Sequence, residues 1–291
     1  PALLARIADL ELVARLVVEG ARLGAHRSPF TGTGAEFQQM RPYLPGDDLK
    51  HLDWKHYART DRLFTRVYRE TTEWPVMLAV DTSRSMAFTD SADVSKLRIA
   101  VLLGAALTYL LVQQGEAVGL SSHADTAGPA LPARTGRVHL VRMLGTLARL
   151  EAAGTTDLGA TVRRATARLG RRGCVVLLSD LYGQTEWQPA LREARRMGHE
   201  VVIFHVLADR ERRLSEAGDV EYRDLETGER LVTSPAAQEQ YARRIDAFVR
   251  EQQDFARDEG ITFMAVDTRA PLDDVLRAFS RQRAPQAGVP R

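Results

Sequence analysis

The stretch Val76-Met77-Leu78-Ala79-Val80-Asp81-Thr82-Ser83-Arg84-Ser85-Met86 decides the fold that this sequence predicts. Its first five residues are all apolar, which is typical of a parallel strand with both faces buried in a core. The strand ends at Asp81, and Ser83 and Ser85 follow at spacings of two, so one loop can direct three oxygen-bearing side chains at a common point. In open α/β sheets, binding sites form beyond the carboxyl ends of the strands.

The oxygen-rich loop after this strand has two interpretations. A carboxylate and two hydroxyls are hard donors, which suit Mg²⁺ or Mn²⁺ better than a soft metal. Alternatively, Asp81 and the serines only cap the helix that follows. Two further stretches favour the metal site: Gly154-Thr155-Thr156-Asp157-Leu158-Gly159, which opens a helical segment, and the apolar Val175-Val176-Leu177-Leu178-Ser179-Asp180, which ends in an acid.

Taken together, the three stretches resemble the metal-ion-dependent adhesion site of von Willebrand factor A domains. That family has Asp-x-Ser-x-Ser after its first strand, a Thr in a middle loop and an Asp after a later strand. The resemblance implies a metal site for Mg²⁺ or Mn²⁺ with the ligands Asp81, Ser83, Ser85, Thr156 and Asp180. Thr155 stands where the pattern often has a second glycine, so Thr155 is the alternative to Thr156 as a ligand.

Composition limits the class of protein. The chain has 291 residues, of which 44% are hydrophobic and 27% charged, as in an ordinary globular protein of one large or two small domains. A formal net charge of +2 gives no argument for nucleic acid as a partner. Cys174 is the only cysteine, which excludes an intrachain disulfide and fits a reducing compartment.

The longest apolar run, residues 99–112, is shorter than the ~20 residues that a membrane helix needs. We interpret it as a buried helix of the core. No signal-peptide pattern is legible at the start of the sequence. We therefore expect a cytoplasmic protein with no membrane span.

Alternating helices and strands predict an α/β fold with a doubly wound, mostly parallel sheet of the von Willebrand factor A or Rossmann type. We expect helices at 3–23, 96–114, 138–150, 158–169, 189–197, 238–259 and 272–279, and strands at 76–80, 117–122, 174–179, 201–207 and 261–266. The strand that ends at Asp81 should be central. Pro129 and Pro132 limit residues 128–136 to a short edge strand at most.

The predicted organisation has an extension at each side of this domain. Residues 1–72 form an N-terminal helix and a loop-rich segment packed on the core, residues 73–282 form the α/β domain, and residues 283–291 form a tail. An insertion at 209–259 interrupts the domain. It contains a β-hairpin with strands at 220–223 and 230–233, followed by the long helix.

Further motifs extend over most of the chain. They are Gly32-Thr33-Gly34-Ala35-Glu36-Phe37, Arg41-Pro42-Tyr43-Leu44-Pro45-Gly46-Asp47-Asp48, Asp53-Trp54-Lys55, Ala58-Arg59-Thr60, Glu70, and Leu225-Glu226-Thr227-Gly228-Glu229. With the loop at 81–86, these motifs resemble the domain-of-unknown-function 58 family. The resemblance implies a von Willebrand factor A-like fold and work with AAA+ ATPases of the MoxR type in complex maturation or remodelling. Many relatives carry membrane helices near the N terminus, and this chain shows none.

Residues 41–60 are rich in acids and arginines, which has two interpretations. Their charge-assisted hydrogen bonds hold this segment to the domain, or they form a surface that docks a partner. The function that the whole sequence predicts is a non-enzymatic module that binds an acidic side chain of a partner, a MoxR-type ATPase or its client, through the metal ion. The alternative is a Mg²⁺-dependent hydrolase or phosphatase. Haloacid-dehalogenase-type phosphatases place a second Asp where this chain has Ser83, and no general base stands out nearby.

Overall fold

The computed structural model describes residues 2–22, 35–43, 52–70, 74–89, 94–123, 127–155, 157–170, 172–182, 187–212, 220–223, 230–233 and 235–283. The chain divides into two compact units. The larger combines Pro1–Pro29 with Pro75–Arg291 and contains the main sheet, and the smaller is Phe30–Trp74. The N-terminal helix therefore belongs to the unit that contains the sheet.

A six-stranded sheet forms the centre of the larger unit, in the order β10-β7-β6-β3-β4-β5. Its strands are β3 (Val76–Asp81), β4 (Val118–His123), β5 (Ala127–Arg134), β6 (Cys174–Ser179), β7 (Glu200–Leu207) and β10 (Thr262–Asp267). Neighbouring strands are parallel except for β5, which is antiparallel to β4. Every residue of β3 is buried, and β3 pairs with β6 on one side and β4 on the other, which confirms its predicted central place.

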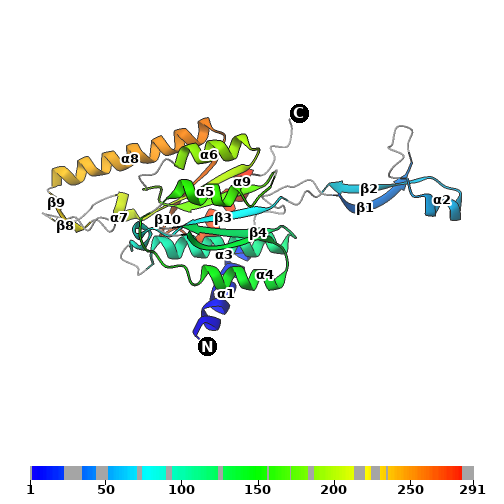
Figure 1. The fold of residues 1–291 in the computed structure, drawn as a ribbon, viewed down its shortest axis with the longest axis horizontal. Coiled ribbons are helices and arrows are strands. Elements are labelled where there is room, and N and C mark those ends of the chain that lie inside the picture. The colour runs from blue at the N-terminus through cyan, green and yellow to red at the C-terminus, as the bar shows by residue number, and fades with distance from the viewer. Residues whose placement is uncertain are drawn as a thin grey trace. The chain divides into compact units, whose positions relative to one another are not determined.

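Helices cover both faces of this sheet, so the predicted doubly wound α/β fold is confirmed. The helices of the larger unit are α1 (Ala2–Arg22), the 3-10 helix η2 (Arg84–Ala87), α3 (Lys96–Gln113), α4 (Arg137–Leu147), α5 (Leu158–Thr166), α6 (Trp187–Arg196), α7 (Asp209–Arg212), α8 (Pro235–Asp258) and α9 (Leu272–Arg283). Figure 1 shows α5, α6 and α8 on one face, and α1, α3 and α4 on the other.

The apolar run at 99–112 lies inside α3, which packs against the sheet as a core helix. By length and composition alone, α3 would suffice to cross a membrane, with a mean hydropathy of 1.5, and it is the one such helix among the described residues. Inside the protein, 78% of it is buried. Its apolar character is thus matched by contacts within the fold.

The edge strand β5 is longer than expected, since it extends over eight residues despite its two prolines. Neither Pro129 nor Pro132 has a partner in the register of β4, because the register shifts twice along the pair. A proline cannot donate to a neighbouring strand, so irregular positions of an edge strand can accommodate it. The prolines therefore produce irregular pairing and do not end the strand.

The smaller unit contains more regular structure than the predicted loop-rich segment. Strands β1 (Ala35–Pro42) and β2 (Phe64–Glu70) form an antiparallel pair, and α2 (Trp54–Thr60) lies between them in the sequence. Asp53 caps α2, because its carboxylate accepts a hydrogen bond of 3.0 Å from the His56 N–H. Signature residues 44–51 lie outside the described part of the chain.

The predicted hairpin is confirmed. Strands β8 (Val220–Arg223) and β9 (Arg230–Thr233) pair in antiparallel fashion, with Val220 opposite Thr233. The long helix α8 follows directly and contributes Phe255 and Ala256 to the core beneath α5 and α6. The insertion thus adds to the packing of the domain as well as extending it.

Candidate functional site

Asp81 ends β3 at the carboxyl edge of the sheet, with only 1% of its surface exposed. Its Oδ1 accepts a hydrogen bond of 2.9 Å from the Ser83 N–H, and its Oδ2 accepts one of 2.6 Å from the Ser179 hydroxyl. The Ser83 and Ser85 hydroxyls lie 2.9 Å apart. The short helix η2 that follows this loop has Ser83 at its cap position with no side-chain cap hydrogen bond, and α3 is capped by Ser95, so helix capping does not account for the Asp81 carboxylate.

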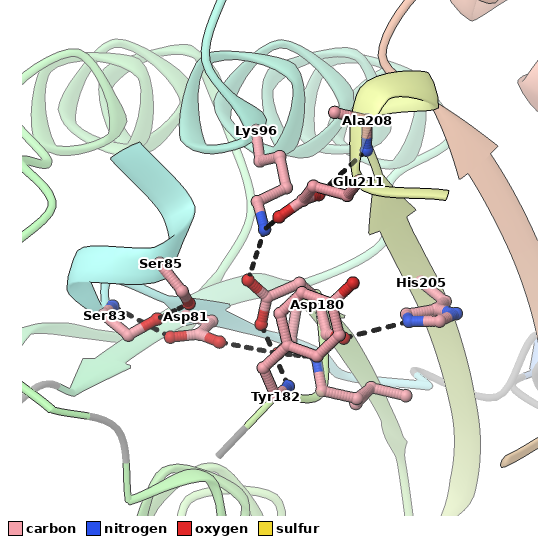
Figure 2. A network of polar contacts seen from close by, with 11 residues as sticks. Asp81, Ser83, Ser85, Lys96, Asp180, Tyr182, His205, Ala208 and Glu211 are labelled. Atoms are coloured by element: carbon pink, nitrogen blue, oxygen red, sulfur yellow. Dashed lines mark hydrogen bonds and ion pairs between the residues drawn. The ribbon is translucent and has the colours of Figure 1, made fainter. Parts of the chain in front are cut away.

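Asp180 follows β6, the neighbour of β3, and Figure 2 shows its side chain near that of Asp81. Its Oδ2 accepts from Lys96 Nζ at 2.7 Å and its Oδ1 from the Tyr182 N–H at 3.1 Å. Its backbone carbonyl lies 2.9 Å from Nε2 of His205. Burial lowers the pKa of His205 to about 4, so the neutral ring donates this hydrogen bond.

Two backbone hydrogen bonds join the threonine loop to the loop that contains the serines. The Arg84 N–H donates to the Gly154 carbonyl at 3.0 Å, and the Ala153 N–H donates to the Thr82 carbonyl at 2.9 Å. Thr155 follows with an exposed side chain. Thr156 lies outside the described residues, so the choice between the two threonines as ligands stays a prediction.

The structure adds two residues that sequence reasoning missed, Lys96 and Glu211. Lys96 is fully buried, and its Nζ lies 2.5 Å from Oε1 of Glu211 as well as 2.7 Å from Asp180. Glu211 belongs to α7, and its other oxygen accepts a hydrogen bond of 3.1 Å from the Ala208 N–H. The signal in the sequence was a lone lysine at the first turn of an apolar helix, where the helix dipole disfavours a cation.

Electrostatics link these buried groups. Burial raises the pKa of Asp81 from 3.8 to about 6, and the nearby Asp180 carboxylate adds to the rise. Burial alone would lower the pKa of Lys96, but the carboxylates of Asp180 and Glu211 outweigh it and raise that pKa. Burial also raises the pKa of Glu211, against the opposing effect of Lys96. The lysine is therefore a charged group held between two acids.

The donor set fits a hard divalent cation in its chemistry. Two carboxylates that repel each other and two serine hydroxyls meet at the ends of adjacent strands, and such oxygens are the ligands that Mg²⁺ prefers. Within the described ranges, no three His, Cys, Asp or Glu side chains lie close enough to share one metal ion. A cation here would depend on the hydroxyls as much as on the acids.

The raised pKa of Asp81 predicts a pH-dependent difference between the wild type and Asp81→Asn in EDTA. An acid whose pKa is raised in the folded state contributes stability below its unfolded pKa and loses that contribution as the pH rises through the folded value. Between pH 7.5 and pH 5, the wild type should gain about 1 kcal/mol relative to the variant. Urea unfolding of both proteins at the two pH values measures this gain.

The comparison of the wild type with Asp81→Asn also controls for the titration of His205. Its lowered pKa gives stability above the unfolded value of 6.5 that is lost as the pH falls towards about 4, and both proteins retain this residue. A difference between wild type and variant that stays constant from pH 7.5 to pH 5 would contradict the raised pKa of Asp81.

Comparisons with known proteins give one family and several relatives. The family model "Protein of unknown function DUF58" matches residues 39–255. "Uncharacterized protein Rv1480" of Mycobacterium tuberculosis is 32% identical over 295 residues, which cover 99% of this chain and 92% of that protein. "Uncharacterized protein Mb1516" of Mycobacterium bovis matches with the same identity and coverage.

Solved structures resemble part of the chain. BatB from Bacteroides thetaiotaomicron covers 72% of this chain and 98% of its own, with 21% identity and a TM-score of 0.47. An aerotolerance-related membrane protein from Bacteroides fragilis has the same coverage and identity, with a TM-score of 0.48. The VWA domain of SpRpn10 covers 75% of this chain and all of its own, with 11% identity and a TM-score of 0.42.

Proposed function

The chain belongs to the DUF58 family, and from that premise we propose that it is a protein-interaction module that binds an acidic side chain of a partner through Mg²⁺ or Mn²⁺. The observation that carries the proposal is the meeting of Asp81, Asp180 and the Ser83 and Ser85 hydroxyls at the carboxyl ends of two adjacent strands. This edge is where α/β sheets of this kind bind their ligands.

The residues that would hold the cation are Asp81, Ser83, Ser85 and Asp180, with Thr156 or Thr155 from the adjoining loop. Hydroxyl ligands carry no charge, and Mg²⁺ commonly keeps several waters beside a few carboxylates. The chemistry that a bound cation supplies is an exchangeable position for an outside oxygen. A carboxylate of a partner protein is the donor that best completes such a set.

Binding is favoured over hydrolysis by what surrounds Ser83. Its hydroxyl contacts the Ser85 hydroxyl and the Asp81 carboxylate, so it lies among the other proposed ligands. His205 is buried and donates to the Asp180 carbonyl, so it is directed away from proton transfer at the serines. The carboxylate beside the serines is that of Asp81, and the proposal assigns it to the cation.

The partner that we propose is a MoxR-type AAA+ ATPase or its client in the cytoplasm, with this chain acting in complex maturation or remodelling. Support for this choice comes from the motifs shared with the DUF58 family. The chemistry that it requires of the partner is an exposed Asp or Glu that can reach the edge formed by β3 and β6.

The test is calorimetric titration of Mg²⁺ and Mn²⁺ into the EDTA-stripped chain. We expect saturable binding by the wild type and no detectable binding by Asp81→Ala, because the variant removes a central carboxylate of the donor set. Asp258→Ala is the matched control, since Asp258 is an exposed acid that pairs with Arg257 at the surface.

The same proteins serve in a pull-down with a MoxR-type ATPase from the same organism. Capture by the wild type and by Asp258→Ala should be lost when EDTA is added, and Asp81→Ala should capture nothing. Equal capture by all three proteins with EDTA present would show that the interaction does not depend on a cation.

A further inference from the structure

Lys96 occupies an unusual position for a lysine. It begins α3 directly after the cap residue Ser95, and no part of its side chain reaches solvent. Lysine is almost never fully buried unless it is paired. The N-terminus of a helix also carries a partial positive charge, which makes it an unfavourable place for an ammonium group. Local sequence preferences therefore do not explain this residue, and its partners must.

The partners of Lys96 are carboxylates from two different parts of the fold. Figure 2 shows the ammonium between Asp180, at the candidate cation site, and Glu211, on α7. The rings of Tyr182 and Phe88 lie 4.8 Å and 5.8 Å from Nζ, and an aromatic face favours a cation. The ammonium is thus surrounded by two carboxylates and two aromatic rings. One of these carboxylates, Asp180, is also a proposed ligand of the cation.

Both oxygens of Asp180 are already engaged. One accepts from Lys96 and the other from the Tyr182 N–H. A divalent cation that draws on Asp180 must therefore compete with a positive charge that is bound to the same carboxylate. Glu211 offers the ammonium a second carboxylate at 2.5 Å, so Lys96 would keep a partner if Asp180 were drawn on by a cation.

The formal charges of these buried groups are consistent with competition between the ammonium and a divalent cation for Asp180. Asp180 and Glu211 share the one ammonium, and Asp81 adds a third acid beside Asp180, so these buried groups carry an excess of two formal negative charges. One divalent cation would neutralise them. Without the cation, the positive charge of Lys96 lies between Asp180 and Glu211 and reduces the repulsion between the acids.

From this arrangement, which rests on the cation site of the proposed function, we infer that Lys96 is a built-in competitor of the divalent cation for Asp180. It stabilises the cation-free form and sets how weakly that form binds the cation. Glu211 is the positioning residue that receives the ammonium when the cation is bound. The chain is therefore built to fold without its cation and to bind it reversibly.

The experiment is calorimetric titration of Mn²⁺ into EDTA-stripped full chain, for the wild type, Lys96→Met and Glu211→Gln. Lys96→Met keeps an unbranched side chain, one atom shorter, and removes its charge, so it should bind Mn²⁺ at least about tenfold more tightly. Glu211→Gln leaves Asp180 as the one acid that holds the ammonium, so it should bind Mn²⁺ several-fold more weakly. Lys96→Gln is the second variant if the Lys96→Met protein does not fold.

Thermal unfolding in EDTA and in Mn²⁺ gives a second readout. Lys96→Met should unfold at a lower temperature than the wild type in EDTA, and added Mn²⁺ should raise its midpoint by more than it raises that of the wild type. A lysine that only joins α3 to α7 would give variants that are less stable, with an unchanged or weaker affinity for Mn²⁺.

The outcomes separate this inference from the proposed function. Saturable Mn²⁺ binding by the wild type, with equal or weaker binding by Lys96→Met, overturns the competitor role and leaves the cation site standing. Mn²⁺ binding by Lys96→Met alone supports the competitor role, because the ammonium then accounts for the weakness of the wild type. No binding by the wild type and both Lys96 variants overturns the competitor role and the cation site together.

Discussion

Replacement of Gly119 by valine is expected to lower the free energy of unfolding by about 3 kcal/mol, the upper part of the range for overpacking. Gly119 lies on β4 directly opposite Met77 of β3. A Cβ at this position would stand 2.4 Å from the Met77 sulfur, 2.7 Å from the Leu131 carbonyl oxygen and 2.8 Å from the Ala133 nitrogen. Two of these atoms are backbone of β5 and cannot move without loss of pairing at the edge of the sheet.

Urea unfolding measures this loss, and Gly104→Ala is the matched control. Gly104 is buried in α3, where a new Cβ would meet its nearest neighbours at 3.5 Å and 3.6 Å, which is ordinary contact. Alanine is also preferred over glycine inside a helix, by about 1 kcal/mol. The control should therefore be as stable as the wild type or more stable. Equal stability of Gly119→Val and the wild type would show that β5 does not lie against β4 as described.

The second large effect is expected from Asp180→Ala in EDTA, a loss of about 3 kcal/mol, as for other buried ion pairs that lose one partner. The substitution leaves the buried ammonium of Lys96 with Glu211 alone. It also removes the acceptor of the Tyr182 N–H. Urea unfolding at neutral pH measures the change in the free energy of unfolding.

A double-mutant cycle with Lys96→Met isolates the pair. If the charge of Lys96 is the reason for the loss, then Asp180→Ala combined with Lys96→Met will cost less than the sum of the two single substitutions. Purely additive losses would contradict a direct interaction between the two side chains. The cycle is independent of any cation, because it is performed in EDTA.

Much of the candidate site could be predicted from local patterns. Asp81, Ser83 and Ser85 are close in sequence, so their spacing after an apolar strand already places them in one loop. Asp180 was expected as a ligand because the resemblance to von Willebrand factor A domains implies an Asp after a later strand, and residues 175–180 are an apolar stretch that ends in an acid. The structure confirms that β3 and β6 are neighbours.

What the sequence by itself determined is the order of the main helices and strands of the α/β domain, the central place of β3 and the loop that follows it. Hydrophobic periodicity and the acids at strand ends are local properties, so they can be recognised from neighbouring residues alone. Only the tertiary structure decided the partners of Lys96, because Asp180 and Glu211 are 84 and 115 residues away in sequence. It also decided the pairing of β5, whose prolines argued against a long strand until the irregular register showed how β4 accommodates them. Contacts between residues far apart in the sequence depend on how the whole chain packs, and the spacing of residues along the sequence does not give their distance in space.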